Sequence, residues 1–240
     1  MKGMLGLKSK YISVLEEDGS VSFGGNQGWV VKDSEKKHSR NNIIRKFGCG
    51  MISGVDIFTY MEGGDTETPL TIDEYREHLH ELERRVFHVS YWLGVPGTRL
   101  ARRMNRLFRK KKMPFKASWG MSGKKLLGRV REMLENDIPV TLGIGPGFFS
   151  KERVELYVMH LDKEGPFVNG NLRYSLRKKG STKDHYVTIT GLLEDEEHTY
   201  FEISSWGRKY FIDYNEFDSY VRKHDNYIFS NIMWIRRKKG

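Results

Sequence analysis

Hydrophobic residues recur at helical spacing in the first half of the chain, most clearly after Phe47. Apolar side chains there keep the i, i+3/i+4, i+7 spacing of one buried helical face: Met51, Ile52, Val55 and Phe58. The pattern predicts a buried helix that begins at or just before Cys49. It should end near Gly63–Gly64, because glycine commonly follows the last turn of a helix.

Three further helices are predicted before residue 138. Thr71 and Glu74 form a capping box that opens a helix reaching about His88. Pro96–Gly97 opens a second helix, and Ser122–Asn136 is the third. The second helix carries a narrow apolar stripe of Leu100, Met104, Leu107 and Phe108. All three patterns are typical of amphipathic helices that cover a core.

In the second half the hydrophobic period changes to that of strands. The predicted strands are Ile138–Gly145, Arg153–Leu161, His185–Leu193, His198–Trp206, Lys209–Ile212 and Tyr227–Ile235. A short helix, Tyr214–His224, precedes the last strand, and a hairpin over Tyr11–Phe23 precedes the helices. Helices followed by strands, without βαβ alternation, predict an α+β class. We expect one domain over residues 1–240, with a helical part at about 41–136 and a sheet part at about 138–236.

Composition narrows the class of protein. The 240 residues are 38% hydrophobic and 30% charged, as in globular proteins with a charged surface. A single cysteine excludes an intramolecular disulfide and suits a reducing compartment. The first residues lack the apolar run of a signal peptide, and no stretch approaches the ~20 apolar residues of a membrane span. We therefore expect a cytoplasmic location.

The net charge of +10 comes mostly from one segment. Arg99–Lys112 contains eight basic residues and no acid, and removing these eight charges leaves +10 − 8 = +2. This segment is a candidate docking surface for an acidic partner or a polyanion. The plainer interpretation is the solvated face of an amphipathic helix.

Cys49 is the first candidate for chemistry. Gly48 and Gly50 flank it, so the backbone can turn sharply and a substrate can approach closely. A cysteine at the start of a helix lies at the positive end of the dipole, which favours the thiolate. The alternative is a small buried hydrophobic residue, the commonest role of a lone cysteine. His185, at the start of a predicted strand, is placed to serve as a general base.

Four short motifs occur in an order that resembles the papain-like cysteine peptidases: Cys49–Gly50, Ile138–Pro139–Val140, His185 to Gly191, and Ser204–Ser205–Trp206–Gly207. The resemblance is closest to the bacterial branch that includes bacteriocin-leader peptidases, and it covers about Asn26–Phe217. It implies a papain-like fold, with the cysteine helix packed on an antiparallel sheet from the second half. It also implies a peptide or protein substrate. We expect no cofactor and no metal.

The sequence departs from this family at two positions. The family places Asn or Asp where this chain has Ser204, the residue that would orient His185. Asp184 and Asp213 are possible substitutes. The family's oxyanion glutamine would fall at Ile43, with Asn42 one residue away. We favour Gln27, because its glycine-rich loop can bring an amide close to a substrate oxygen. Trp206 is expected to shield the contact between His185 and Ser204.

The expected activity is hydrolysis or acyl transfer at an amide or thioester. Cys49 and His185 would form a thiolate–imidazolium pair, while Gln27 and the Cys49 N–H stabilise the oxyanion. A catalytically inactive papain-like fold that binds peptides or acts as a scaffold is the alternative. A polyanion-binding protein that uses Arg99–Lys112 is a third reading.

Overall fold

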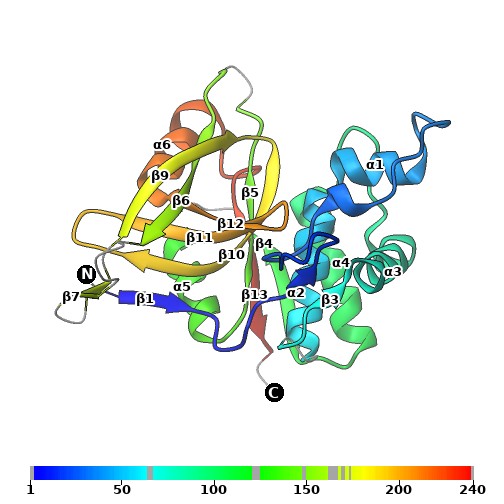
Figure 1. Ribbon diagram of the computed structural model, residues 1–240, viewed down its shortest axis with the longest axis horizontal. Helices are drawn as coiled ribbons and strands as arrows, with labels where there is room; N and C mark the ends of the chain where they lie inside the picture. Colours follow the sequence, from blue (N-terminus) through cyan, green and yellow to red (C-terminus); the bar gives the residue numbers. More distant parts are fainter. Residues whose placement is uncertain are drawn as a thin grey trace.

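The structure, a computed structural model, describes residues 3–63, 67–120, 125–147, 150–161, 167–168, 171–172 and 174–238 (Figure 1). Its α-helices are α1 (Arg40–Phe47), α2 (Cys49–Glu62), α3 (Ile72–Leu82), α4 (Gly97–Lys110), α5 (Leu126–Glu135) and α6 (Tyr214–His224). A 3-10 turn, η1, covers Gln27–Trp29, and a π-helical turn, η2, covers Glu83–Phe87.

The strands of the main sheet are β1 (Gly3–Gly6), β4 (Phe115–Trp119), β5 (Val140–Ile144), β6 (Val154–Leu161), β9 (Tyr174–Thr182), β10 (His185–Glu194), β11 (Thr199–Ser205), β12 (Arg208–Asp213) and β13 (Ile232–Arg237). Two small pairs lie apart from it: β2 (Val14–Leu15) with β3 (Leu70–Thr71), and β7 (Phe167–Val168) with β8 (Asn171–Leu172).

The main sheet is antiparallel and runs in the order β4-β13-β5-β10-β11-β12-β6-β9, with β1 pairing the far end of β10. In the register of β5 and β10, His185 lies opposite Ile144 and Val187 opposite Leu142. Val187 and Leu142 are both buried, so β10 crosses the centre of the sheet. The α+β class with an antiparallel sheet is confirmed.

Helix α2 packs against β10 and β5 and is buried over most of its length. A helix that is apolar on nearly all sides needs neighbours on nearly all sides. The sheet covers one side of α2, and α3 and α4 cover others. Figure 1 shows α1 to α4 on one side of the molecule and the sheet, with α5 and α6, on the other.

The predicted division into a helical half and a sheet half is only partly followed. β4 comes from the first half and forms an edge of the sheet beside β13, and β1 pairs with β10. β9, beside β6, had no strand pattern that the sequence analysis recognised. One hydrophobic cluster joins the helices and the sheet, so both parts share a core.

Several predicted boundaries shift. β13 begins at Ile232 instead of Tyr227, because the side chain of Asn226 accepts hydrogen bonds from the backbone of Ile228 and Phe229 and holds a turn there. The Tyr11–Phe23 hairpin is reduced to a bridge between Leu15 and Val21.

Two predicted helix ends fall on residues outside the described part of the chain. The predicted start of α5 at Ser122 lies there, and the described helix begins at Leu126. α2 ends at Glu62, followed by Gly63 at φ 78°, whereas Gly64 lies outside the described residues. Within the described part of the chain, no helix has the length and apolar character needed to cross a bilayer.

Candidate active site

Cys49 is the first residue of α2, joined to α1 only through Gly48. The backbone N–H groups of Tyr186 and Gly50 point at its sulfur. A Cβ atom on Gly50 would lie 3.0 Å from the Tyr186 ring, so glycine allows α2 to sit this closely on β10. This packing places Cys49 beside the residue that directly follows His185.

His185 is held on two sides at the start of β10. Its Nε2 lies 2.8 Å from the Ser205 hydroxyl. The indole of Trp206 stacks on the imidazole, with ring centroids 4.3 Å apart and an interplanar angle of 11°. Together these contacts fix the ring plane and leave Nδ1 as the nitrogen not bonded to Ser205.

A cavity of about 20 Å³, enough for roughly one water molecule, brings the predicted residues together. Its walls include all four residues singled out from the sequence: Gln27, Cys49, His185 and Ser204. Ser205 and Trp206 also line it. Gln27 and Cys49 come from the N-terminal part of the chain and the others from β10, β11 and the turn after it, so only the fold unites them.

The serine that contacts His185 is Ser205, not Ser204 as predicted. Ser204 instead donates its hydroxyl hydrogen to the carbonyl of Phe23, at 2.6 Å. Neighbouring side chains on a strand point in opposite directions, so a one-residue difference changes which neighbour is reached. Motif spacing alone could not decide between two adjacent serines at the end of β11.

Gln27 lies beside the cavity, and its Nε2 donates to the carbonyl of Arg45 at 2.8 Å. A glutamine amide has two N–H groups, and this bond uses one of them. Asn42, the alternative considered for the oxyanion, bonds the backbone of Asp33 and Lys36 instead. Ile43 carries no polar side chain. Of the three candidates Gln27, Asn42 and Ile43, Gln27 is therefore the one that lines the cavity together with Cys49.

Neither aspartate considered as a substitute orients His185. Asp213 is buried, caps α6 and lies 2.6 Å from Nδ1 of a different histidine, His198. Asp184 is exposed, and its charge raises the pKa of the Cys49 thiol. The pKa of His185 is lowered by burial.

Burial favours the uncharged forms of both central groups. It raises the pKa of Cys49 to about 11, against the opposing effect of the Tyr186 and Gly50 N–H groups. It lowers the pKa of His185 to about 4. The predicted thiolate–imidazolium pair is thus disfavoured at rest. The helix begins where it was expected, but burial has a larger effect on the pKa of Cys49 than the backbone N–H groups at the helix start.

A buried carboxylate that no sequence motif had indicated lies beside this cavity. Asp56, 1% exposed, accepts hydrogen bonds from the Tyr75 hydroxyl at 2.7 Å, the Gly25 N–H at 2.8 Å and the Tyr11 hydroxyl at 3.3 Å. Burial raises its pKa to about 6. A Cβ on Gly25 would lie 1.8 Å from the Tyr75 hydroxyl oxygen of α3 and 2.9 Å from Oδ1 of Asp56 on α2, so the loop that leads to Gln27 is held directly on both helices. The sequence did contain a signal for this carboxylate, because Asp56 is an acidic residue among the apolar residues of α2.

The basic residues of α4 lie on its outer side. Leu100, Met104, Leu107 and Phe108 are buried, as the stripe predicted. Arg99, Arg102 and Arg106 are exposed; partial burial, followed by the charges of these three arginines, lowers the pKa of Arg103. Docking of an acidic partner or polyanion on this surface stays a prediction.

No group of three or more His, Cys, Asp or Glu side chains that could hold a metal ion occurs among the described residues. His78, on α3, lies 2.9 Å from the Thr59 hydroxyl.

No family model matches this chain, and neither the curated proteins nor the solved structures give a match.

Proposed function

We propose that this chain is a papain-like cysteine enzyme that hydrolyses a peptide amide or thioester or transfers its acyl group. The observation that carries the proposal is a single small cavity shared by Cys49 and His185. A base whose ring is fixed by a hydroxyl on one side and an indole on another is typical of an oriented nucleophile–base pair. The order of the motifs along the chain supports the same family.

The proposed reaction begins from a neutral thiol and a neutral imidazole. As the sulfur of Cys49 attacks the carbonyl carbon, the thiol proton moves to Nδ1 of His185. We assign the tautomer in which Nε2–H donates to the Ser205 oxygen, 2.8 Å away, so that Nδ1 is available as the acceptor. The ion pair forms with the new S–C bond and does not precede it, in keeping with the pKa directions of the resting groups.

Two N–H donors are assigned to the carbonyl oxygen that becomes negative: the Gln27 amide and the Cys49 backbone. Each such donor typically contributes about 2.7–4 kcal/mol to the transition state. When the C–N or C–S bond breaks, His185 returns its proton to the leaving group. Water then releases an acid, or an amine accepts the acyl group.

Acylation of Cys49 by an activated ester, such as p-nitrophenyl acetate, tests the pair without a known substrate. We expect a burst of nitrophenol and an acetyl group on the Cys49 peptide by mass spectrometry. His185→Ala should slow acylation about 10²-fold or more, because it removes the base. Equal acylation of the two folded proteins would contradict the proposal.

The two adjacent serines provide a matched comparison. Ser205→Ala should slow acylation by about tenfold and alter its pH profile, because the imidazole loses its hydrogen bond. Ser204→Ala removes a bond to Phe23 and should leave the profile in place. If the Ser204 variant has the larger effect on the profile, Ser205 is not the positioning residue.

A catalytically inactive peptide-binding fold is the second candidate. It is favoured by a serine in place of the family's Asn or Asp, and by pKa shifts that keep both groups neutral. It predicts that Cys49 acylates no faster than the same thiol in urea-unfolded protein, whether or not His185 is present.

A further inference from the structure

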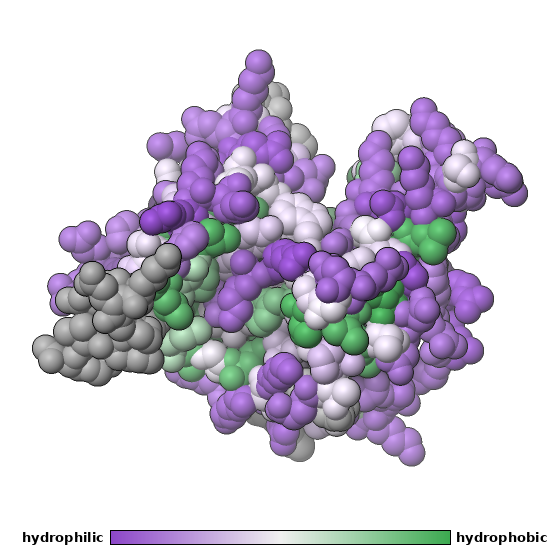
Figure 2. Space-filling model, in the orientation of Figure 1, coloured by the Kyte–Doolittle hydropathy of each residue, from purple (hydrophilic) through white to green (hydrophobic). Residues whose placement is uncertain are grey.

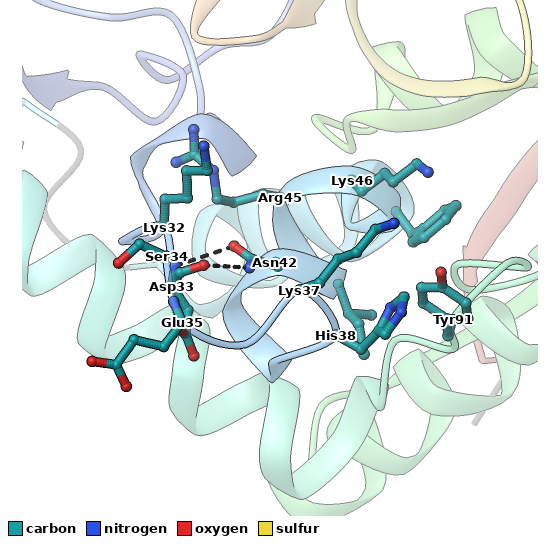
Figure 3. Close-up of a pocket in the computed structure, with 12 residues that line it drawn as sticks. Lys32, Asp33, Ser34, Glu35, Lys37, His38, Asn42, Arg45, Lys46 and Tyr91 are labelled. Carbon is teal, nitrogen blue, oxygen red and sulfur yellow. Dashed lines mark hydrogen bonds between the residues drawn. The ribbon is translucent and has the colours of Figure 1, made fainter.

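A larger cavity, of about 650 Å³, lies on the outer side of α1 (Figure 3). It is formed by the segment before α1, by α1 itself and by Tyr91. Its volume falls within the usual range of ligand sites. Figure 2 shows a mostly hydrophilic surface over the projection that carries α1, the part of the molecule to which this cavity belongs. We call the cavity beside α1 the α1 groove.

The α1 groove borders the active site. Gln27, which lines the Cys49 cavity, donates to the backbone carbonyl of Arg45, and Arg45 lines the groove. Phe47, another lining residue, precedes Cys49 by two positions. An extended peptide advances about 3.3 Å per residue, so a chain lying in the groove would come within a few residues of the sulfur.

Aromatic rings form one end of the groove. Tyr91 meets His38 edge-to-face at 4.8 Å between centroids, Phe47 at 5.6 Å and the neighbouring Trp92 at 4.6 Å. These rings stay accessible, and Trp92 is 73% exposed. Edge-to-face rings left open to water are suited to packing against apolar or aromatic side chains.

The turn that carries Tyr91 and Trp92 is fixed in a costly shape. Ser90 and Gly94 exchange two backbone hydrogen bonds, of 2.9 and 3.0 Å, across it. Trp92 has φ 78°, a region that bulky side chains rarely adopt. Burial does not account for this conformation, because the side chain faces water. A strained, exposed aromatic beside a groove is a feature expected of a recognition surface.

The aromatic end is also positively charged. In Figure 3 the side chains of Lys37 and Lys46 extend toward the same end, beside His38 and Tyr91. Within the described part of the chain, neither lysine has a carboxylate within ion-pair distance. Asp33 is already bonded to backbone N–H groups, and Glu35, which also lines the groove, lies at the end opposite Lys46 and Tyr91 in Figure 3.

We propose that the α1 groove is the substrate-recognition site of this enzyme, and that it takes an extended peptide segment combining acidic with aromatic side chains. The acids pair with Lys37 and Lys46, and the aromatic side chains pack on Tyr91 and Trp92. This proposal rests on the proposed function, because it assigns the occupant to the substrate of Cys49.

The test uses full-length Cys49→Ala protein, which binds without chemistry. Two fluorescein-labelled peptide pools of equal length are compared by fluorescence anisotropy. One has Asp, Glu, Phe and Tyr at its mixed positions, and the other has Lys and Arg in place of the acids. We expect the acidic pool to bind at least about tenfold more tightly, and Lys37→Glu with Lys46→Glu to remove that preference. Trp92→Ser should weaken binding of the acidic pool.

Lys36→Glu is the matched control, because Lys36 is exposed, neighbours Lys37 and does not line the groove. It should change affinity by less than about twofold. Equal binding of the two pools, or an equal loss in the Lys36 variant, would overturn the proposal. The latter result would mean that the preference reflects overall charge only.

Failure of this proposal and failure of the proposed function are distinguishable. Selective binding of the acidic pool, with no acylation of wild-type Cys49, would leave the groove as the peptide site of an inactive protein. Acylation that depends on His185, with no preference for acidic peptides, would overturn the groove alone.

Discussion

The two cavities at the α1–α2 junction differ in almost every physical respect. The Cys49 cavity has a volume of about 20 Å³, and the α1 groove about 650 Å³. Around the first, the polar side chains of Asp56, Ser204 and Ser205 are buried and hydrogen-bonded. Beside the second, Lys37 and Lys46 are exposed. Gly48 and Cys49 are all that separates the last residue of α1 from the body of α2.

This difference separates two requirements of a site. Proton transfer needs an imidazole held in one orientation and few competing water molecules. A small cavity surrounded by hydrogen-bonded side chains meets both needs. Recognition of a long ligand needs accessible charge and apolar surface, which would be unstable if buried. A buried hydroxyl chain illustrates the first case: Thr188 donates to Ser53, and Ser53 lies 2.8 Å from Thr141. Stability should therefore respond strongly to changes in one cavity and weakly in the other.

The largest loss of stability is expected from Asp56→Ala. The substitution leaves the Tyr75 hydroxyl, the Gly25 N–H and the Tyr11 hydroxyl without their acceptor. We expect the free energy of unfolding to fall by about 4 kcal/mol, measured by urea denaturation. Asp56→Asn keeps the shape and one acceptor oxygen and should cost about half as much. A loss below about 1 kcal/mol for the alanine variant would contradict a central role for this carboxylate.

An intermediate effect is expected from pH, through His185. Its pKa is about 4 in the fold, against the ordinary value of 6.5. Between these values the unfolded chain binds the extra proton, so this group's contribution to stability is present above about pH 6.5 and is lost as pH falls toward 4. The difference of about 2.5 in pKa corresponds to about 3 kcal/mol at most.

His185→Gln should remove this loss on acidification. Asp56 acts in the opposite direction. Its pKa is raised to about 6 in the fold, so on acidification the folded state binds this proton before the unfolded chain does, which stabilises the fold. The free energies of unfolding of the wild type and the variant are therefore measured by urea titration at several pH values. Subtracting one from the other at each pH cancels the contribution of Asp56, which both proteins share. Parallel stability profiles for the two proteins would mean that His185 is more hydrated than its burial suggests.

The smallest effect is expected at the α1 groove. Lys37→Glu with Lys46→Glu should change the free energy of unfolding by less than about 0.5 kcal/mol, since both ammonium groups are exposed. If the double variant loses the preference for acidic peptides while its stability is unchanged, the contrast between the Cys49 cavity and the α1 groove is strengthened. A loss of several kcal/mol would mean that the lysines support the fold of α1, and the contrast between the two cavities would no longer hold.

Hydrophobic patterns predicted several of the buried regular elements well. α2, α4, β5 and β10 lie close to the predicted ranges, because their apolar residues repeat at the period of the element. β9 was missed since its exposed and half-buried positions carry a run of basic and polar side chains, Arg177–Lys178–Lys179. α1 was missed because it buries only Ile44.

The sequence by itself determined which residues could carry chemistry: the single cysteine at a glycine-flanked helix start, His185 at a strand start, and a Ser-Ser-Trp-Gly segment downstream. Only the tertiary structure decided how they meet. It chose Ser205 over Ser204 through the direction of two adjacent side chains, and it placed Asp56 against a loop 31 residues away. It also set the protonation of Cys49 and His185, because burial depends on every element packed around them and no local pattern records it.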